Sequence, residues 1–110
     1  MNQVLFIPEV REYFKDLVPV LYDLGYFSYL DRSQRYVKEL IDDIKKNLPV
    51  KLKRPAPEYF NKYGGEMEYA VFTKNKRTTW YVFFDTYEDS EKVIYLVRYI
   101  SNNHVIAQYF

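Results

Sequence analysis

The sequence contains no cysteine and a single histidine, His104, among its 110 residues. The absence of cysteine excludes disulfides and cysteine-based zinc sites, and one histidine argues against a histidine-rich metal centre. No apolar run is long enough to span a membrane. The segment from Met1 to Pro8 lacks the basic start and long apolar core of a signal peptide. We therefore expect a cytoplasmic protein with no membrane partner, no metal ion and no other cofactor.

The chain is rich in aromatic residues and has a basic middle. Tyrosine and phenylalanine dominate an aromatic share of 20%, and the formal net charge is only +1. Residues 45–77 nevertheless hold nine basic and three acidic side chains, between flanking segments that are net negative. Such a concentration fits polyanion binding, and it fits a solvated loop and helix end about as well. The candidate nucleic-acid contacts in this region are Lys51, Lys53, Arg54, Lys74 and Lys76.

The periodicity of the apolar residues predicts an α+β fold. Helical spacing predicts helices over residues 8–24 and 31–48. Runs of β-branched and aromatic residues, separated by polar breaks, predict strands over residues 66–73, 77–85, 93–101 and 104–109. The whole chain, residues 1–110, is then one domain. In it, a helical hairpin packs on one face of a four-stranded antiparallel meander.

A symmetric hairpin between the second and third strands would place Arg77 opposite Ser101, and an Asn102-Asn103 turn would place Ser101 opposite His104. Alternation then puts the more apolar side chains, which include Trp80, under the helices. It puts Arg77 and His104 on the open face, in one row, with Tyr81 and Tyr99 able to stack on a base. A register shift of one residue would reverse every side chain of a strand.

Each of these residues also has a structural interpretation. Arg77 at a strand start is more often a solvated edge cation, and His104 after a turn is more often an incidental surface residue. Arg98 interrupts an apolar run and would lie opposite Trp80. We therefore expect Arg98 to make a cation–π contact with that ring.

The chain resembles the RelE/ParE superfamily of bacterial toxin–antitoxin toxins. The resemblance rests on the Lys76–Phe84 strand, on the strand that contains Arg98, and on the ending Ala107-Gln-Tyr109-Phe. In the mRNA-cleaving branch it implies that Arg77 is the strand arginine and that Lys74 and Lys76 are the basic pair before it. The positions near the C-terminus would be filled by His104, Tyr109 or Arg98.

This resemblance implies an endoribonuclease that cuts mRNA on the ribosome and is held inactive by an antitoxin protein. Arg77 would stabilise charge on the scissile phosphate, His104 would be the general acid or base, and Tyr99 would complete the catalytic set. Tyr81 would contact the RNA. Two alternatives stay open: a toxin of the same fold that binds DNA gyrase, and an inactive domain that binds a protein through exposed tyrosines.

Overall fold

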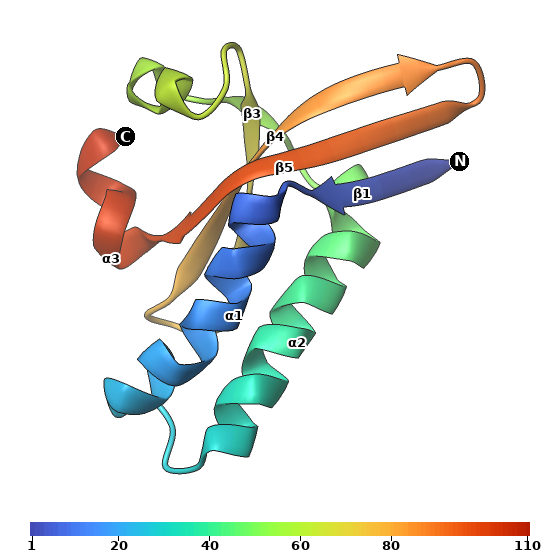
Figure 1. The fold of residues 1–110 in the computed structure, drawn as a ribbon. Helices are drawn as coiled ribbons and strands as arrows, with labels where there is room; N and C mark the ends of the chain where they lie inside the picture. The colour runs from blue at the N-terminus through green and yellow to red at the C-terminus, as the bar shows by residue number, and fades with distance from the viewer.

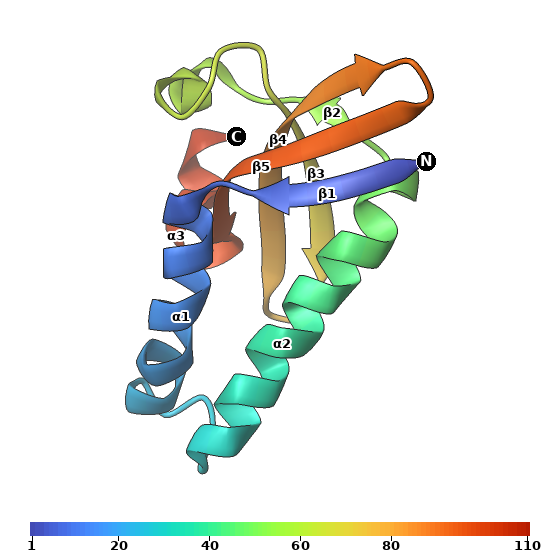
Figure 2. The same ribbon diagram turned by 45° about the vertical axis from the view of Figure 1, so that its right-hand side comes forward.

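A computed structural model describes residues 1–110, and its centre is a five-stranded mixed sheet in the order β1-β5-β4-β3-β2. The helices are α1 (Pro8–Asp23), α2 (Leu30–Asn47) and the short α3 (Asn103–Ile106). The strands are β1 (Asn2–Phe6), β2 (Arg54–Pro55), β3 (Glu68–Thr73), β4 (Thr79–Asp89) and β5 (Lys92–Asn102). Figures 1 and 2 show α1 and α2 together on one side of the sheet, with the β4–β5 hairpin reaching beyond them.

The α+β class and both long helices are confirmed, whereas the four-stranded meander is not matched. The structure adds β1, which pairs in parallel with β5, and the two-residue strand β2. The predicted strand at residues 104–109 is wrong, because residues 103–109 form α3 and a 3₁₀ helix (η3, Ala107–Tyr109). Asn102 explains the error: its side-chain oxygen accepts the backbone N–H of His104 and so caps a helix start instead of closing a hairpin.

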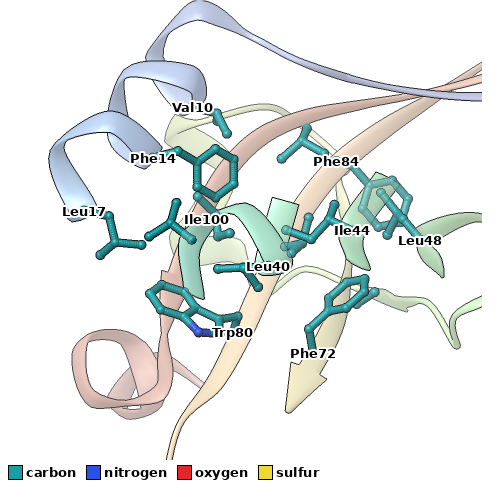
Figure 3. Close-up of a cluster of buried hydrophobic side chains, with 14 of the residues drawn as sticks. Val10, Phe14, Leu17, Leu40, Ile44, Leu48, Phe72, Trp80, Phe84 and Ile100 are labelled. Carbon is teal, nitrogen blue, oxygen red and sulfur yellow. The ribbon is translucent and has the colours of Figure 1, made fainter. Parts of the chain in front are cut away.

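The main core lies between the two long helices and the sheet (Figure 3). Each helix buries one stripe at helical spacing, which is the pattern that predicted it. The stripes meet buried side chains of β3, β4 and β5; the central members are Phe14, Leu17, Leu40, Ile44, Phe72, Trp80, Val82, Phe84 and Ile100. Trp80 satisfies its buried indole by donating Nε1–H to the Tyr36 hydroxyl at 2.9 Å.

The register between β4 and β5 differs from the predicted one. Ser101 lies opposite Tyr81 instead of Arg77, and the two strands continue to Asp89 opposite Lys92. The expected loop at residues 86–92 is therefore mostly strand, closed by a tight turn in which Ser90 adopts a φ of 48°. An irregularity at Phe83/Phe84 leaves Arg98 without a pairing partner and shifts the alternation along β5. As a result Tyr95 and Val97, instead of Ile94 and Leu96, are buried in the main core.

The sheet face that the sequence predicted to be open is covered by a second, smaller core. Phe60, Met67, Phe83 and Ile106 are buried there, and Tyr69, Tyr81, Tyr99 and Tyr109 pack around them. Phe60 comes from a 3₁₀ helix (η2, Glu58–Lys62), and Ile106 comes from α3. Segments before β3 and after β5 therefore close over this face together.

Candidate functional site

Asn103 joins the β3–β4 loop to the start of α3. Its side-chain Nδ2 donates to the carbonyl oxygen of Arg77 at 3.2 Å, and its Oδ1 accepts the N–H of Thr79 at 3.0 Å. Asn75 holds the same loop from inside, because its Oδ1 accepts the N–H groups of Arg77 and Thr78, both at 2.9 Å. The backbone of Arg77 is therefore fixed next to the residue that precedes His104.

Arg77 and His104 are brought to the same end of the sheet, but not in the way the sequence suggested. Arg77 precedes β4, and His104 lies in α3, so the predicted row across three strands does not form. Ser101, the middle of that row, is buried opposite Tyr81. Both side chains are exposed, and neither makes a hydrogen bond or an ion pair. They are therefore available to a ligand.

Tyr99, the third predicted catalytic residue, lies elsewhere. It pairs with Phe83, four residues along β4 from Thr79, which corresponds to roughly 13 Å of strand. Its ring stacks on Tyr63 with centroids 3.9 Å apart, inside the second core. The structure does not bring Tyr99 together with Arg77 and His104.

The predicted nucleic-acid contacts separate into packed and exposed residues. The Lys51 ammonium lies 4.6 Å from the Phe72 ring centroid, and Lys53 donates to the carbonyls of Pro49 and Lys51. Tyr81 packs against Tyr69 and Phe110. These contacts give Lys51, Lys53 and Tyr81 structural roles.

Three further predicted contacts lie on or near the surface. Lys74 is mostly covered and forms an ion pair with Asp43 at 3.8 Å. Arg54, on β2, and Lys76, in the β3–β4 loop, are exposed. Lys76 therefore adds positive charge beside Arg77 at the end of the sheet.

The expected cation–π contact between Arg98 and Trp80 is wrong. Arg98 pairs through Nε with Asp85 and donates from Nη2 to the Tyr87 hydroxyl at 3.2 Å. These hydrogen bonds, first that of Tyr87 and then that of Asp85, raise the pKa of the Arg98 guanidinium. Its aliphatic stem passes Gly64, where an added Cβ would lie 2.9 Å from Arg98 Cδ. The hydrogen bonds of Arg98 therefore link β5 to β4, and its stem lies against Gly64 in the segment before β3.

A groove of about 550 Å³ that sequence reasoning missed adjoins His104. Its walls come from α1, the α1–α2 connection, the β3–β4 loop and α3, and aromatic rings line much of it: Tyr13, Tyr26, Phe27, Tyr36 and Trp80. Asp16, Asn75 and Asn102 supply polar groups. The groove is formed by elements far apart in the chain, so no local pattern could have indicated it.

Tyrosine hydroxyls gather at a second hollow, of about 380 Å³, near the start of α1. Tyr13, Tyr63 and Tyr99 line it together with Lys62. Burial, and secondarily the neighbouring Tyr99, raises the pKa of Tyr13 to about 12. Burial likewise raises the pKa of Tyr99.

The raised pKa of Tyr13 predicts a loss of stability at alkaline pH. The unfolded chain loses the phenolic proton near pH 10.0, while the folded protein keeps it to about 12. The contribution of the neutral Tyr13 hydroxyl to the free energy of unfolding is fully present below pH 10. It is lost as the pH rises through the pKa of the folded state, about 12. Between the two pKa values, 10.0 and about 12, we expect the free energy of unfolding to fall less in Tyr13→Phe than in wild type. The two losses should differ by at most about 3 kcal/mol. Urea unfolding at pH 9 and pH 11.5 measures this, and equal losses in both proteins would contradict it.

None of the helices combines the length and apolar composition needed to cross a bilayer. No group of three or more His, Asp or Glu side chains is placed to hold a metal ion. Comparison of the chain with protein-family models, with curated proteins and with solved structures found no match.

Proposed function

We propose that this protein is the toxin of a toxin–antitoxin pair and cleaves mRNA without a metal ion. The observation that carries the proposal is the Asn103 bridge, which holds the exposed Arg77 and His104 at one end of the sheet. Lys76 adds a further exposed cation in the same loop. A cation and an imidazole that reach the same phosphate are the minimal set for cleavage of a phosphodiester by general acid–base chemistry.

The reaction that fits these groups is attack by a ribose 2′-hydroxyl on the adjacent phosphorus. The new O–P bond forms as the bond to the 5′-oxygen breaks, which leaves a 2′,3′-cyclic phosphate and a 5′-hydroxyl. His104 would take the proton from the 2′-hydroxyl or give one to the leaving oxygen, with water serving the other step. Arg77 would stabilise the negative charge that builds on the phosphoryl oxygens. Asn103 is a positioning residue, because it acts only by fixing the backbone of Arg77.

The proposal includes the partners and location implied by the family resemblance: mRNA on the ribosome, an antitoxin protein, and the cytoplasm. It does not include base stacking by Tyr81 or Tyr99, because both rings pack within the second core. The aromatic groove, in contrast, has His104 among its lining residues.

Expression in bacterial cells tests the proposal. Wild type is expected to stop growth and fragment mRNA, while Arg77→Ala lowers the cleavage rate by roughly 10²–10³-fold, as loss of one charge-stabilising donor does. His104→Ala should lower it by roughly 10²–10⁴-fold. Arg35→Ala removes an exposed arginine from α2 and is the matched control. Equal growth and intact mRNA in all four cultures would reject the proposal.

Purified protein distinguishes positioning from chemistry. Asn103→Ala should reduce cleavage of a single-stranded RNA while the pH profile keeps its shape, whereas His104→Ala should remove the limb of the profile that depends on the imidazole. Growth arrest with intact RNA would redirect the proposal to the gyrase-targeting alternative, which a DNA supercoiling assay checks.

The groove beside His104 favours one other function, that of a protein-interaction domain. Val20, Leu24 and Tyr26 are exposed large apolar residues along it. Patches of this kind on soluble proteins often mark interaction sites. A stable complex with the product of a neighbouring gene, without toxicity of the free protein, would support this second candidate.

A further inference from the structure

The outer edge of β3 is only partly covered by β2. The two strands pair at Arg54–Tyr69 and Pro55–Glu68, and the last hydrogen bond between these segments runs from the Ala56 N–H to the Met67 carbonyl at 2.9 Å. On the side of β3 that faces β4, the Lys74 N–H donates to the Thr78 carbonyl at 3.1 Å, so the even-numbered residues face β4. Backbone groups therefore alternate, with odd-numbered residues of β3 facing outward.

Val71 and Thr73 are the odd-numbered residues beyond the end of β2. Their N–H and C=O groups point away from β4, and no strand pairs with them on that side. Two residues thus present two donors and two acceptors at the spacing of a sheet ladder. Unpaired strand edges of this kind are templates for another strand.

An apolar hollow of about 370 Å³ adjoins this edge, on the same sheet face as Val71. Leu52, Tyr81 and Phe110 line it together with Val71. Leu52 is 72% exposed, Phe110 48% and Val71 39%, so the apolar surface here is open to solvent. A side chain that projected from an added strand onto this face would bury it.

The surroundings of the edge are positive. Arg54 lines the hollow, and the Lys51 ammonium lies over the ring of Phe72 in β3. The exposed Lys76 and Arg77 lie in the loop that follows β3, and Lys74 pairs with Asp43. Glu68 is the only acidic side chain of β3 itself. This charge favours an acidic ligand and disfavours pairing of two copies of the edge, which would bring like charges together.

We propose that the outer edge of β3 binds an extended acidic segment of a partner protein by antiparallel strand addition at Val71 and Thr73. Apolar residues of the segment lie opposite Val71 and Thr73, on the sheet face that carries the hollow. Acidic residues alternate with them on the opposite face, where Lys51 lies over Phe72. The antiparallel direction is the one that β3 adopts with both of its neighbours. RNA fits this edge less well, because phosphates accept hydrogen bonds but cannot donate to the outward carbonyls. The proposal is independent of RNA cleavage.

The test uses the full chain and a fluorescein-labelled peptide of sequence Glu-Val-Asp-Val-Glu, blocked at its C-terminus. Binding is measured by fluorescence anisotropy. N-methylation of both valine nitrogens removes the donors that would face β3, and we expect it to weaken binding about tenfold or more. N-methylation of the Asp and the last Glu alters nitrogens that face solvent, so this control peptide should bind nearly as well as the parent.

Variants of the protein test the same edge from the other side. Val71→Pro removes the outward N–H of Val71 without removing a hydrogen bond to β4, and edge strands tolerate proline. It should weaken binding, whereas Val71→Thr, which keeps the N–H, should weaken it far less. Arg54→Glu should also weaken binding, and added salt should reduce the difference in affinity between this variant and wild type.

Three results would overturn the proposal. One is equal affinity for the two N-methylated peptides, which need no protein variant and so do not depend on the folding of Val71→Pro. Another is a peptide footprint, in amide chemical shifts, at the groove beside His104 instead of at β3. The third is a wild-type dimer that Val71→Pro converts to monomer, which would assign the edge to a second copy of the chain.

Discussion

Replacing Phe60 by alanine is expected to lower the free energy of unfolding by about 3–5 kcal/mol, the usual range for a buried phenylalanine. Phe60 is fully buried in the second core, and its ring centroid lies 4.4 Å from that of Phe83 and 5.4 Å from that of Phe110. It is the one fully buried side chain of η2, a helix of five residues. Without it, little apolar burial remains to hold residues 58–62 against the sheet.

The effect of Phe60→Ala should be uneven across the molecule. Amide exchange is expected to accelerate most in η2, α3 and η3, which pack on that face of the sheet, and least in α1 and α2. Tyr59→Ala is the matched control, because Tyr59 is 40% exposed in the same helix and should cost less. Uniform acceleration of exchange in α1 and α2 would contradict the idea that the two cores are separable.

The sequence carries strong information where a pattern is local. The stripe of Val37, Leu40 and Ile44 repeats at helical spacing, and it predicted α2 to within a residue or two. β1 carries no such signal, because five residues that pair in parallel with β5 depend on a partner about ninety positions away. Asparagine is common both in turns and as a helix cap. The sequence predicts Asn102 as a turn residue, whereas in the structure it caps α3.

The candidate site shows the same limit. Arg77 and His104 were expected to share a row through strand register, but the register is different, and the link between their segments is the side-chain amide of Asn103, which donates to the backbone carbonyl of Arg77. The alternation of residues along a sequence cannot reveal a link that a side chain makes to the backbone of another segment. The burial of Tyr81 and Tyr99 was unpredictable for a related reason, since η2 and the C-terminal segment cover them only in three dimensions.

Phe72→Ala, the counterpart of Phe60→Ala in the main core, should reduce stability by a similar amount, about 3–5 kcal/mol, but through global unfolding. Phe72 is fully buried, lies opposite Trp80 in the β3–β4 ladder, and carries the Lys51 ammonium 4.6 Å from its ring centroid. Its removal leaves a cavity between the sheet and both long helices, so all elements should lose protection together.

Urea unfolding followed by the fluorescence of Trp80, the only tryptophan, measures this change directly. Phe72→Leu is the control, because it keeps most of the apolar volume and should recover much of the lost stability. If Phe72→Ala instead loosened only η2 and α3, or if Phe72→Leu were as unstable as Phe72→Ala, burial in the main core would not be what Phe72 contributes. A global loss for Phe72 beside a local loss for Phe60 would establish that one sheet supports two independently packed faces.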